Sequence, residues 1–184
     1  AAKESAAIIC PSEHIKRLCI LAGVDSKKLE VVFNSRNPDQ IINAANEVPT
    51  SFPSFVHLGR LTPKKNPLAT LEAFRIVHSE FQDAKLTFIG GGELKSVVEE
   101  RIQDYKLEGN VVLAGEMPHD DALKLMSSHW IYCQHSVTSR QGDSEGMPVS
   151  IAEASLLGMP IVSTYHNGIP EEVIHGETGF LVKE

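Results

Sequence analysis

The chain has 184 residues, 42% of them hydrophobic and 22% charged, which suits one ordinary globular domain with a substantial core. Its net charge is −7, and the sequence has no basic stripe that could neutralise phosphates, which argues against a nucleic-acid-binding surface. The three cysteines have no C-x-x-C spacing, so neither a disulfide framework nor a zinc site is indicated, and a reducing cytoplasm is expected. No apolar run reaches the roughly 20 residues that a membrane span needs.

Strand-like and helix-like segments alternate from the start of the chain. A predicted strand over 6–10, a helix over 11–23 and a strand over 29–33 form one strand–helix–strand unit. The polar, proline-rich stretch over 34–53 is typical of a linker. We therefore interpret residues 1–33 as the remnant of an N-terminal domain.

Beyond the linker the alternation becomes regular. The predicted strands cover residues 54–59, 85–90, 110–115, 130–134, 160–164 and 179–182. The predicted helices cover residues 67–80, 93–106, 119–128, 148–157 and 170–174. Continuous apolar strands between helices indicate a parallel sheet covered on both faces, which is a doubly wound, Rossmann-like α/β domain. Ligands are expected at the carboxyl ends of its strands. The domain over 54–184 is predicted to be truncated at its C-terminus, because its last strand almost coincides with the end of the chain.

The loop in "HLGRLTPKKNP" places Arg60 and Lys65 after a strand and next to Gly59. A glycine lets backbone and ligand approach closely, and two cations on one loop suit a pyrophosphate. A solvated basic loop is the alternative interpretation.

The stretch "FIGGGE" follows the next strand and invites comparison with a dinucleotide-binding fingerprint. Gly90 and Gly92 supply the first two glycines, and Glu116 could mimic the ribose-binding acid. However, Lys95 stands where a small third residue should pack. We therefore favour a tight strand-to-helix turn over a nicotinamide or flavin site.

In "EGMPVSIAE", Glu145 and Glu153 are separated by seven residues. Proline is favoured at the first helical position, so the helix is predicted to begin at Pro148. The two carboxylates then flank a helix N-terminus, which is a natural anion-binding site. Glu153 lies in a largely apolar helix, where a carboxylate needs a partner, and a pair of ligand hydroxyls is a reasonable one. The N–H groups that can meet an anion are those near Gly146, Met147, Val149 and Ser150.

The other polar residues are interpreted as structural rather than functional. Asp143 and Glu145 in "GDSE" resemble an acidic metal-binding pair, but two acids on one loop are weak evidence. The histidines show no i, i+4 metal pair and are interpreted mostly as packing or surface residues. This group includes His57, His119, His129, His135, His166 and His175. Cys133, in the middle of a predicted strand, is interpreted as a small core residue.

Four motifs in order, "GRLTPKKNP", "FIGGGE", "EGMPVSIAE" and "HNGIPEEVIHGETGFLV", resemble those of the retaining family 4 glycosyltransferases of the GT-B fold. The resemblance covers residues 54–184 and implies the C-terminal, donor-binding half of that architecture. It implies that Glu145 contacts the hydroxyls of the donor sugar and that Glu153 holds the ribose hydroxyls. Arg60 and Lys65 correspond to the diphosphate-binding pair, and Met117 to a position that lines the nucleobase pocket. The implied catalytic residues are Glu145, Arg60 and Lys65.

The resemblance further implies a hexosyltransferase that uses a nucleotide sugar as substrate, with no cofactor and no metal. The acceptor, a polysaccharide or lipid-linked glycan, would be bound through the N-terminal domain, so the 184-residue chain alone is expected to be inactive. A cytoplasmic protein in polysaccharide biosynthesis, peripheral to the inner membrane, is the expected setting. A nucleotide-sugar epimerase of GT-B fold and a non-catalytic nucleotide-sugar-binding module are the alternatives. The base, the sugar and the acceptor stay open.

Overall fold

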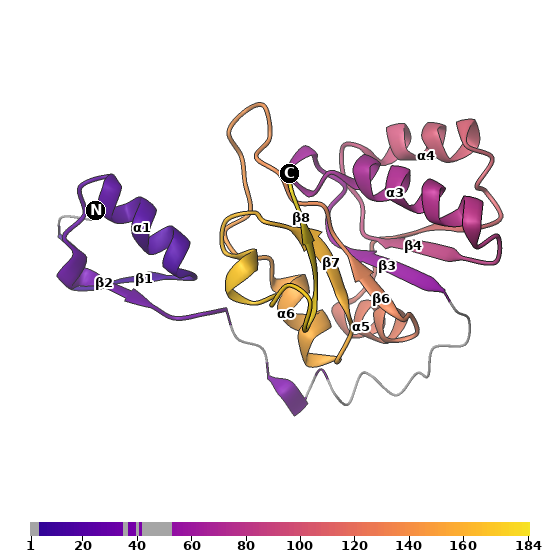
Figure 1. The fold of residues 1–184 in the computed structure, drawn as a ribbon. Helices are drawn as coiled ribbons and strands as arrows, with labels where there is room; N and C mark the ends of the chain where they lie inside the picture. The colour runs from indigo at the N-terminus through magenta and orange to yellow at the C-terminus, as the bar shows by residue number, and fades with distance from the viewer. Residues whose placement is uncertain (1–3, 35–36, 40, 42–52) are drawn as a thin grey trace.

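The computed structural model describes residues 4–34, 37–39, 41 and 53–184. Its N-terminal part forms a small unit in which strands β1 (Ile8–Cys10) and β2 (Leu29–Val31) pair in parallel. Helix α1 (Glu13–Leu21) and the 3-10 turn η1 (Ser26–Lys28) connect the two strands (Figure 1). The Ser12 side chain caps α1, because its hydroxyl oxygen accepts a hydrogen bond from the Ile15 N–H at 3.1 Å.

The main body is a six-stranded parallel sheet with helices on both faces (Figure 1). Its strands are β3 (Ser54–Leu58), β4 (Lys85–Ile89), β5 (Val111–Gly115), β6 (Ile131–Cys133), β7 (Ile161–Thr164) and β8 (Gly179–Val182). Its helices are α3 (Pro67–Glu80), α4 (Lys95–Asp104), α5 (His119–Ser127) and α6 (Val149–Leu156), with 3-10 turns η2 (Pro63–Lys65) and η3 (Ile169–Glu171). The predicted α/β class, a doubly wound Rossmann-like domain, is therefore confirmed.

Apolar residues of each strand alternate between two cores, as period-2 side-chain geometry requires. On one face, Phe88 packs with residues of α3 and α4, including Leu71 and Val98. On the other face, the neighbouring Ile89 packs with residues of α5 and α6, including Ile151. Burial on both faces explains why the strands are continuous apolar runs rather than alternating ones.

The strand order β5-β4-β3-β6-β7-β8 places the topological switch point between β3 and β6. The chain builds outward from β3 through β4 to β5, then returns to the other side of β3 and builds outward again. The loops that follow β3 and β6 therefore lie next to each other at the carboxyl edge of the sheet. This crevice is where open α/β sheets bind ligands.

The element boundaries differ from the sequence-based prediction in two instructive places. Helix α6 begins at Val149 rather than at Pro148, which is its N-cap, with φ −68° and an extended ψ of 121°. The extended ψ is the backbone conformation that an N-cap residue usually has. The helix predicted over 170–174 is only the 3-10 turn η3.

Most of the stretch predicted as a linker (34–53) lies outside the described residues. Ile41, which is described, has a side chain that is only 1% exposed and packs in the core between the sheet and α5 and α6. This part of the chain therefore contributes a side chain to the body of the main domain.

Candidate functional site

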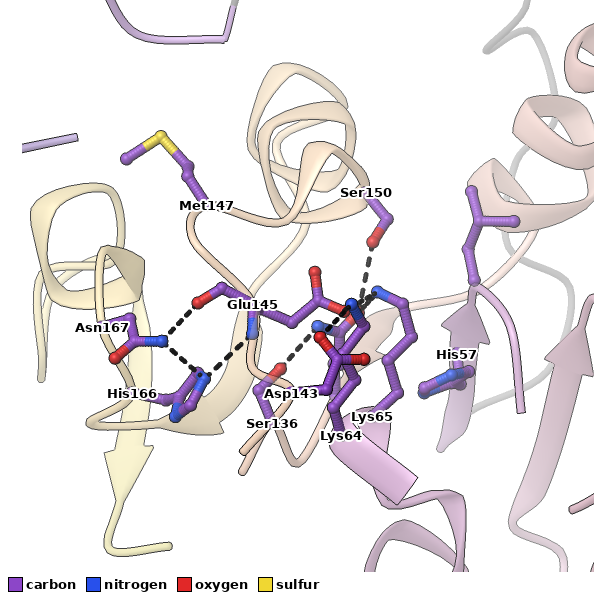
Figure 2. Close-up of polar contacts among 12 residues, drawn as sticks. His57, Lys64, Lys65, Ser136, Asp143, Glu145, Met147, Ser150, His166 and Asn167 are labelled. Carbon is purple, nitrogen blue, oxygen red and sulfur yellow. Dashed lines mark hydrogen bonds and ion pairs between the residues drawn. The ribbon is translucent and has the colours of Figure 1, made fainter. Parts of the chain in front are cut away.

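Two loops meet at the switch point and carry the polar residues singled out in the sequence. The loop after β3 contains Lys64 and Lys65, which lie in the 3-10 turn η2. The loop after β6 contains Glu145 and leads into α6. The Val137 N–H donates a hydrogen bond to the Lys64 carbonyl at 2.9 Å, which ties the two loops together. Figure 2 shows the side chains of both loops converging.

Lys65 is the centre of this cluster. Its Nζ lies 3.5 Å from Glu145 Oε1 and donates a hydrogen bond to Gln134 Oε1 at 3.1 Å. Burial lowers the pKa of Lys65, and the Glu145 carboxylate counteracts part of that effect. The side chain crosses directly over Gly59, where a Cβ atom would lie 2.9 Å from the lysine Cδ. A side chain at position 59 would displace the lysine, and the φ of 152° at Gly59 is itself a conformation that favours glycine.

Lys64, which the sequence analysis did not single out, joins the same cluster. Its Nζ lies 3.2 Å from Asp143 Oδ1 and 3.8 Å from Glu145 Oε1. The two acids of "GDSE" are therefore compensated by lysines of the neighbouring loop. No group of three or more His, Cys, Asp or Glu side chains that could hold a metal is found within the described part of the chain. The sequence feature that could have identified Lys64 is the pair of adjacent lysines in "PKK".

A buried polar network supports the cluster from below. Tyr132 Oη lies 2.8 Å from both Gln134 Oε1 and Ser150 Oγ, and Gln134 Nε2 donates to Ser136 Oγ at 2.7 Å. Burial raises the pKa of Tyr132, so its hydroxyl stays protonated. The network links β6 to the first turn of α6. It also fixes the orientation of the Gln134 side-chain amide, which accepts the hydrogen bond from Lys65.

His57 and Cys133 lie behind this network. His57 is fully buried, and its Nδ1 lies 3.1 Å from the Cys133 carbonyl oxygen, to which it donates. Burial, reinforced by the Lys65 charge, lowers the pKa of His57 to about 3, so the ring is neutral. Burial also raises the pKa of the Cys133 thiol to about 12, which disfavours the thiolate, and the residue is half-buried rather than part of the core that was predicted for it.

The first turn of α6 is joined to Lys65 through Gln134, whose Oε1 accepts hydrogen bonds from Lys65 Nζ and from Ser150 Oγ. Val149 and Ser150 are its first residues, preceded by Gly146 and Met147 in the loop. The Met147 carbonyl accepts a hydrogen bond from Asn34 Nδ2 at 3.2 Å, while the N–H groups of these residues have no intrahelical partner. A positive helix end and two ammonium groups thus border one position.

Glu153 lies deeper in α6, with only 3% of its surface exposed. Its Oε1 is 2.8 Å from Nε2 of His119, the first residue of α5. One partner of this buried carboxylate is therefore a side chain of the protein, in addition to the ligand hydroxyls that the sequence predicts. His119 is about half exposed, so this pair lies at the surface of the crevice.

Arg60 and Met117 line a separate cavity of about 350 Å³ beside the cluster. Gly59 and two glycines of "FIGGGE", Gly90 and Gly91, also line it. A Cβ atom on Gly90 would lie 2.3 Å from the Gly59 carbonyl oxygen, and one on Gly92 would lie 2.6 Å from the Leu61 carbonyl oxygen. These glycines thus form a tight turn packed on the backbone of the neighbouring loop.

The described residues contain no helix with both the length and the apolar character to cross a lipid bilayer. The residues implied by the resemblance lie on the loops after β3, β5 and β6 and on helix α6. Lys65, Glu145 and Ser150 form the central cluster, Arg60 and Met117 border the adjoining cavity, and Glu153 lies behind the helix start.

Comparison with known proteins identifies the family. A family model described as "Glycosyl transferases group 1" matches residues 38–184. The amylovoran biosynthesis glycosyltransferase AmsK of Erwinia amylovora is 31% identical over 165 residues, which are 90% of this chain and 40% of the relative. A GDP-mannose-dependent alpha-(1-6)-phosphatidylinositol monomannoside mannosyltransferase of Mycolicibacterium smegmatis is 28% identical over 131 residues, 71% of this chain and 34% of the relative.

Among solved structures, Anabaena Alr3699/HepE in complex with UDP superimposes with a TM-score of 0.79 at 22% identity. The match covers 100% of this chain and 51% of that protein, so the likeness is one of fold. The chain spans about two fifths of AmsK. Together with the α/β fold and the switch-point site, the match over residues 38–184 shows that this chain belongs to the group 1 glycosyltransferase family.

Proposed function

We propose that this chain is the donor-binding part of a retaining, family 4 glycosyltransferase. The complete protein transfers a hexose from a nucleoside diphosphate sugar to a growing polysaccharide or lipid-linked glycan. The acceptor is bound by a part of the protein outside this chain, so the chain alone binds the donor without turning it over.

The observation that carries this proposal is the state of the Glu145 carboxylate. Its Oε1 is buried, and it accepts no hydrogen bond from any residue that the structure describes. Among the described residues, its neighbours of opposite charge are Lys65 at 3.5 Å and Lys64 at 3.8 Å. A buried carboxylate oxygen with free acceptor capacity is costly unless a ligand completes it, and a sugar hydroxyl is a suitable donor.

The diphosphate fits between the lysine loop and the start of α6. Lys65 and Arg60 supply charge-assisted contacts, and the helix end adds the equivalent of about half a positive charge. Pro148 has no N–H, so the phosphates are met by the N–H groups of Gly146 and Met147 on one side and of Val149 and Ser150 on the other. As the sugar–phosphate bond breaks, the same groups stabilise the charge that develops on the leaving diphosphate.

The nucleoside lies on the other side of the helix start. The Glu153 carboxylate, already oriented by His119 at 2.8 Å, accepts hydrogen bonds from the ribose hydroxyls. The cavity bordered by Met117 and Arg60 has room for a nucleobase. The donor therefore spans the helix N-terminus, with its sugar at Glu145 and its ribose at Glu153.

The names of the relatives support the finer assignments. AmsK is named for the biosynthesis of a polysaccharide, amylovoran, which supports a glycan acceptor. The Mycolicibacterium smegmatis relative is named for an alpha linkage formed from GDP-mannose, and HepE was solved with UDP. The alpha linkage named for the mycobacterial relative is consistent with retention, and both names are consistent with a nucleoside diphosphate donor, with a different base in each. A cytoplasmic enzyme, peripheral at the inner face of the inner membrane, is the setting that we propose.

Calorimetric titration of the 184-residue chain with UDP, GDP and ADP, and with their hexose conjugates, tests the proposal. We expect one base series to bind and the Lys65→Met variant to bind it at least tenfold more weakly, while the distant Lys124→Met variant serves as a control for charge. Failure of every nucleotide to bind would reject the proposal. In the complete protein, conversion of the donor without an acceptor would indicate an epimerase, and binding without turnover would indicate a sensing module.

A further inference from the structure

The loop that carries Glu145 is joined to the segment after β7 by three hydrogen bonds. The Glu145 N–H donates to His166 Nε2 at 3.2 Å, and Asn167 Nδ2 donates to the Glu145 carbonyl. The Gly168 N–H donates to the Gly146 carbonyl at 3.0 Å. Figure 2 shows His166 and Asn167 on one side of Glu145 and the two lysines on the other. Both main-chain polar groups of Glu145 are therefore occupied by protein.

His166 is completely buried, and its second nitrogen is held by a carboxylate. Its Nδ1 lies 2.6 Å from Glu184 Oε1, and Glu184 Oε2 accepts a hydrogen bond from the Thr138 N–H at 3.1 Å. Burial acts to raise the pKa of Glu184, but the hydrogen bonds from His166 and Thr138 outweigh it and lower that pKa. Glu184 is thus an ionised acceptor that binds both His166 and the loop after β6.

These contacts define the tautomer of the imidazole. An ionised carboxylate can only accept, so Nδ1 carries the proton. The Glu145 N–H can only donate, so Nε2 presents its lone pair. Asn167 Nδ2, at 3.0 Å from the same Nε2, is a second donor that requires the same assignment. A proton on Nε2 would place an N–H against two other N–H groups and break both contacts.

We propose that His166 and Glu184 are positioning residues, which fix the main chain at Glu145 and thereby aim its carboxylate at the donor sugar. The inference rests on the proposed function, because it assigns a purpose to the same carboxylate. The loop from Gln134 to Pro148 has no helix or strand of its own, so its geometry depends on such attachments. His166 lies two residues after Thr164, the last residue of β7. Its hydrogen bond to Glu145 therefore attaches the loop to the end of a sheet strand.

In the sequence, His166 stands out no more than the other scattered histidines, because its partners lie 18 to 21 positions away along the chain. His129 is a second buried histidine with which His166 can be compared. That histidine is also buried, and it contacts Thr87 Oγ1 and the Leu125 carbonyl, each at 2.8 Å, within the other part of the domain. It provides a matched control for a structural role alone.

The first test measures, for each variant, how much more tightly the chain binds the hexose donor than the corresponding nucleoside diphosphate. We expect His166→Leu to lower this ratio at least fivefold, with affinity for the diphosphate itself unchanged within twofold. His166→Gln, whose amide oxygen can accept the Glu145 N–H, should restore most of the ratio. His129→Leu should lower the thermal midpoint and leave the ratio unchanged. A folded His166→Leu variant with the wild-type ratio would overturn the proposal.

Two further measurements cover the case in which His166→Leu does not fold. Glu184→Ala changes a partly exposed side chain and should lower the same ratio at least twofold, and an unchanged ratio would overturn the proposal. Nitrogen chemical shifts of His166 in the unliganded chain should show a protonated Nδ1 and an unprotonated Nε2 at neutral pH, and the opposite tautomer would overturn it. A wild-type chain that binds neither ligand would instead reject the donor-binding function, and with it this inference.

Discussion

Lys65 Nζ lies 3.5 Å from Glu145 Oε1, so a cation from the loop after β3 and a carboxylate from the loop after β6 form an ion pair across the switch point. The two residues are 80 positions apart in the chain and meet only because β3 and β6 are neighbours in the sheet. Each holds the other in place before a ligand arrives, which is how a preorganised site limits the ordering cost of binding.

Lys65→Met should weaken binding of a nucleoside diphosphate and spare the plain nucleoside. A charge-assisted phosphate contact contributes about 1.5–3 kcal/mol, which corresponds to a loss of about 10- to 100-fold in affinity. Arg60→Ala should act in the same direction. Calorimetry with both ligands measures the difference, and Lys124→Met on α5 is the charge-matched control. Equal losses for diphosphate and nucleoside would mean that Lys65 does not meet the phosphates.

Affinity for the diphosphate should fall at alkaline pH, and Glu145→Gln should move that fall to lower pH. Burial lowers the pKa of Lys65, and only the protonated amine attracts phosphate. The Glu145 carboxylate opposes this lowering, so its removal lowers the pKa of Lys65 further. Calorimetric titrations with the diphosphate between neutral pH and pH ~10 cover the range below the usual lysine pKa of ~10.4. Circular dichroism at each pH verifies folding. Identical profiles for wild type and variant would contradict the coupling.

Glu145→Gln and Glu153→Gln should fail in different ways. Glu153 is expected to hold the ribose, so its variant should weaken the nucleoside diphosphate and the intact donor alike. Glu145 is expected to contact only the sugar, so its variant should spare the diphosphate near neutral pH and weaken the intact donor. Replacing a carboxylate acceptor by an amide should cost about 1 kcal/mol, which calorimetry resolves. Equal effects of both substitutions on both ligands would refute this division of roles.

Binding of the donor should survive a chelator. Lys64 and Lys65 compensate Asp143 and Glu145, and the start of α6 adds further positive character where the phosphates are proposed to lie. Titration of the chain with its donor, first in excess chelator and then with added manganese, compares the two conditions. We expect affinities equal within a factor of about two, which is less than 0.5 kcal/mol. Binding that appears only with manganese would favour the acidic-pair interpretation of "GDSE".

Glu172→Gln should stabilise the fold above neutral pH. Burial raises the pKa of Glu172 to about 7, and its Oε2 is buried without a hydrogen-bond partner among the described residues. Between its usual pKa and 7 the folded state retains a proton that the unfolded state has lost, so stability falls as pH rises through this window and is lowest above it. Allowing for solvent screening of this partly exposed group, the variant should gain about 1–2 kcal/mol at pH ~8.

Chemical denaturation at pH ~4 and pH ~8 measures the effect of Glu172→Gln, since the difference should vanish at the acidic end. Glu177→Gln is the control, because Glu177 is exposed and lines, together with Glu172, a cavity of about 420 Å³. A gain of equal size at both pH values would show that ionisation of Glu172 is not the cause.

The sequence by itself determined the class of fold and the general location of the site. Continuous apolar strands that end in glycine require burial on both faces, and helix α3 (Pro67–Glu80) was predicted with its observed limits because Pro67 marks its start. Local signals of this kind depend only on neighbouring residues. The same holds for the polar loops after β3 and β6, whose composition singled out Lys65 and Glu145.

Only the tertiary structure decided which side chains meet. His119 lies 34 positions from Glu153, Lys64 lies 79 from Asp143, and His166 lies 21 from Glu145. A periodic pattern in the sequence cannot predict these contacts, because they follow from the order in which the strands pair. The sheet places β6 beside β3 and β7 beside β6, and burial then requires each enclosed polar group to find a partner from another element.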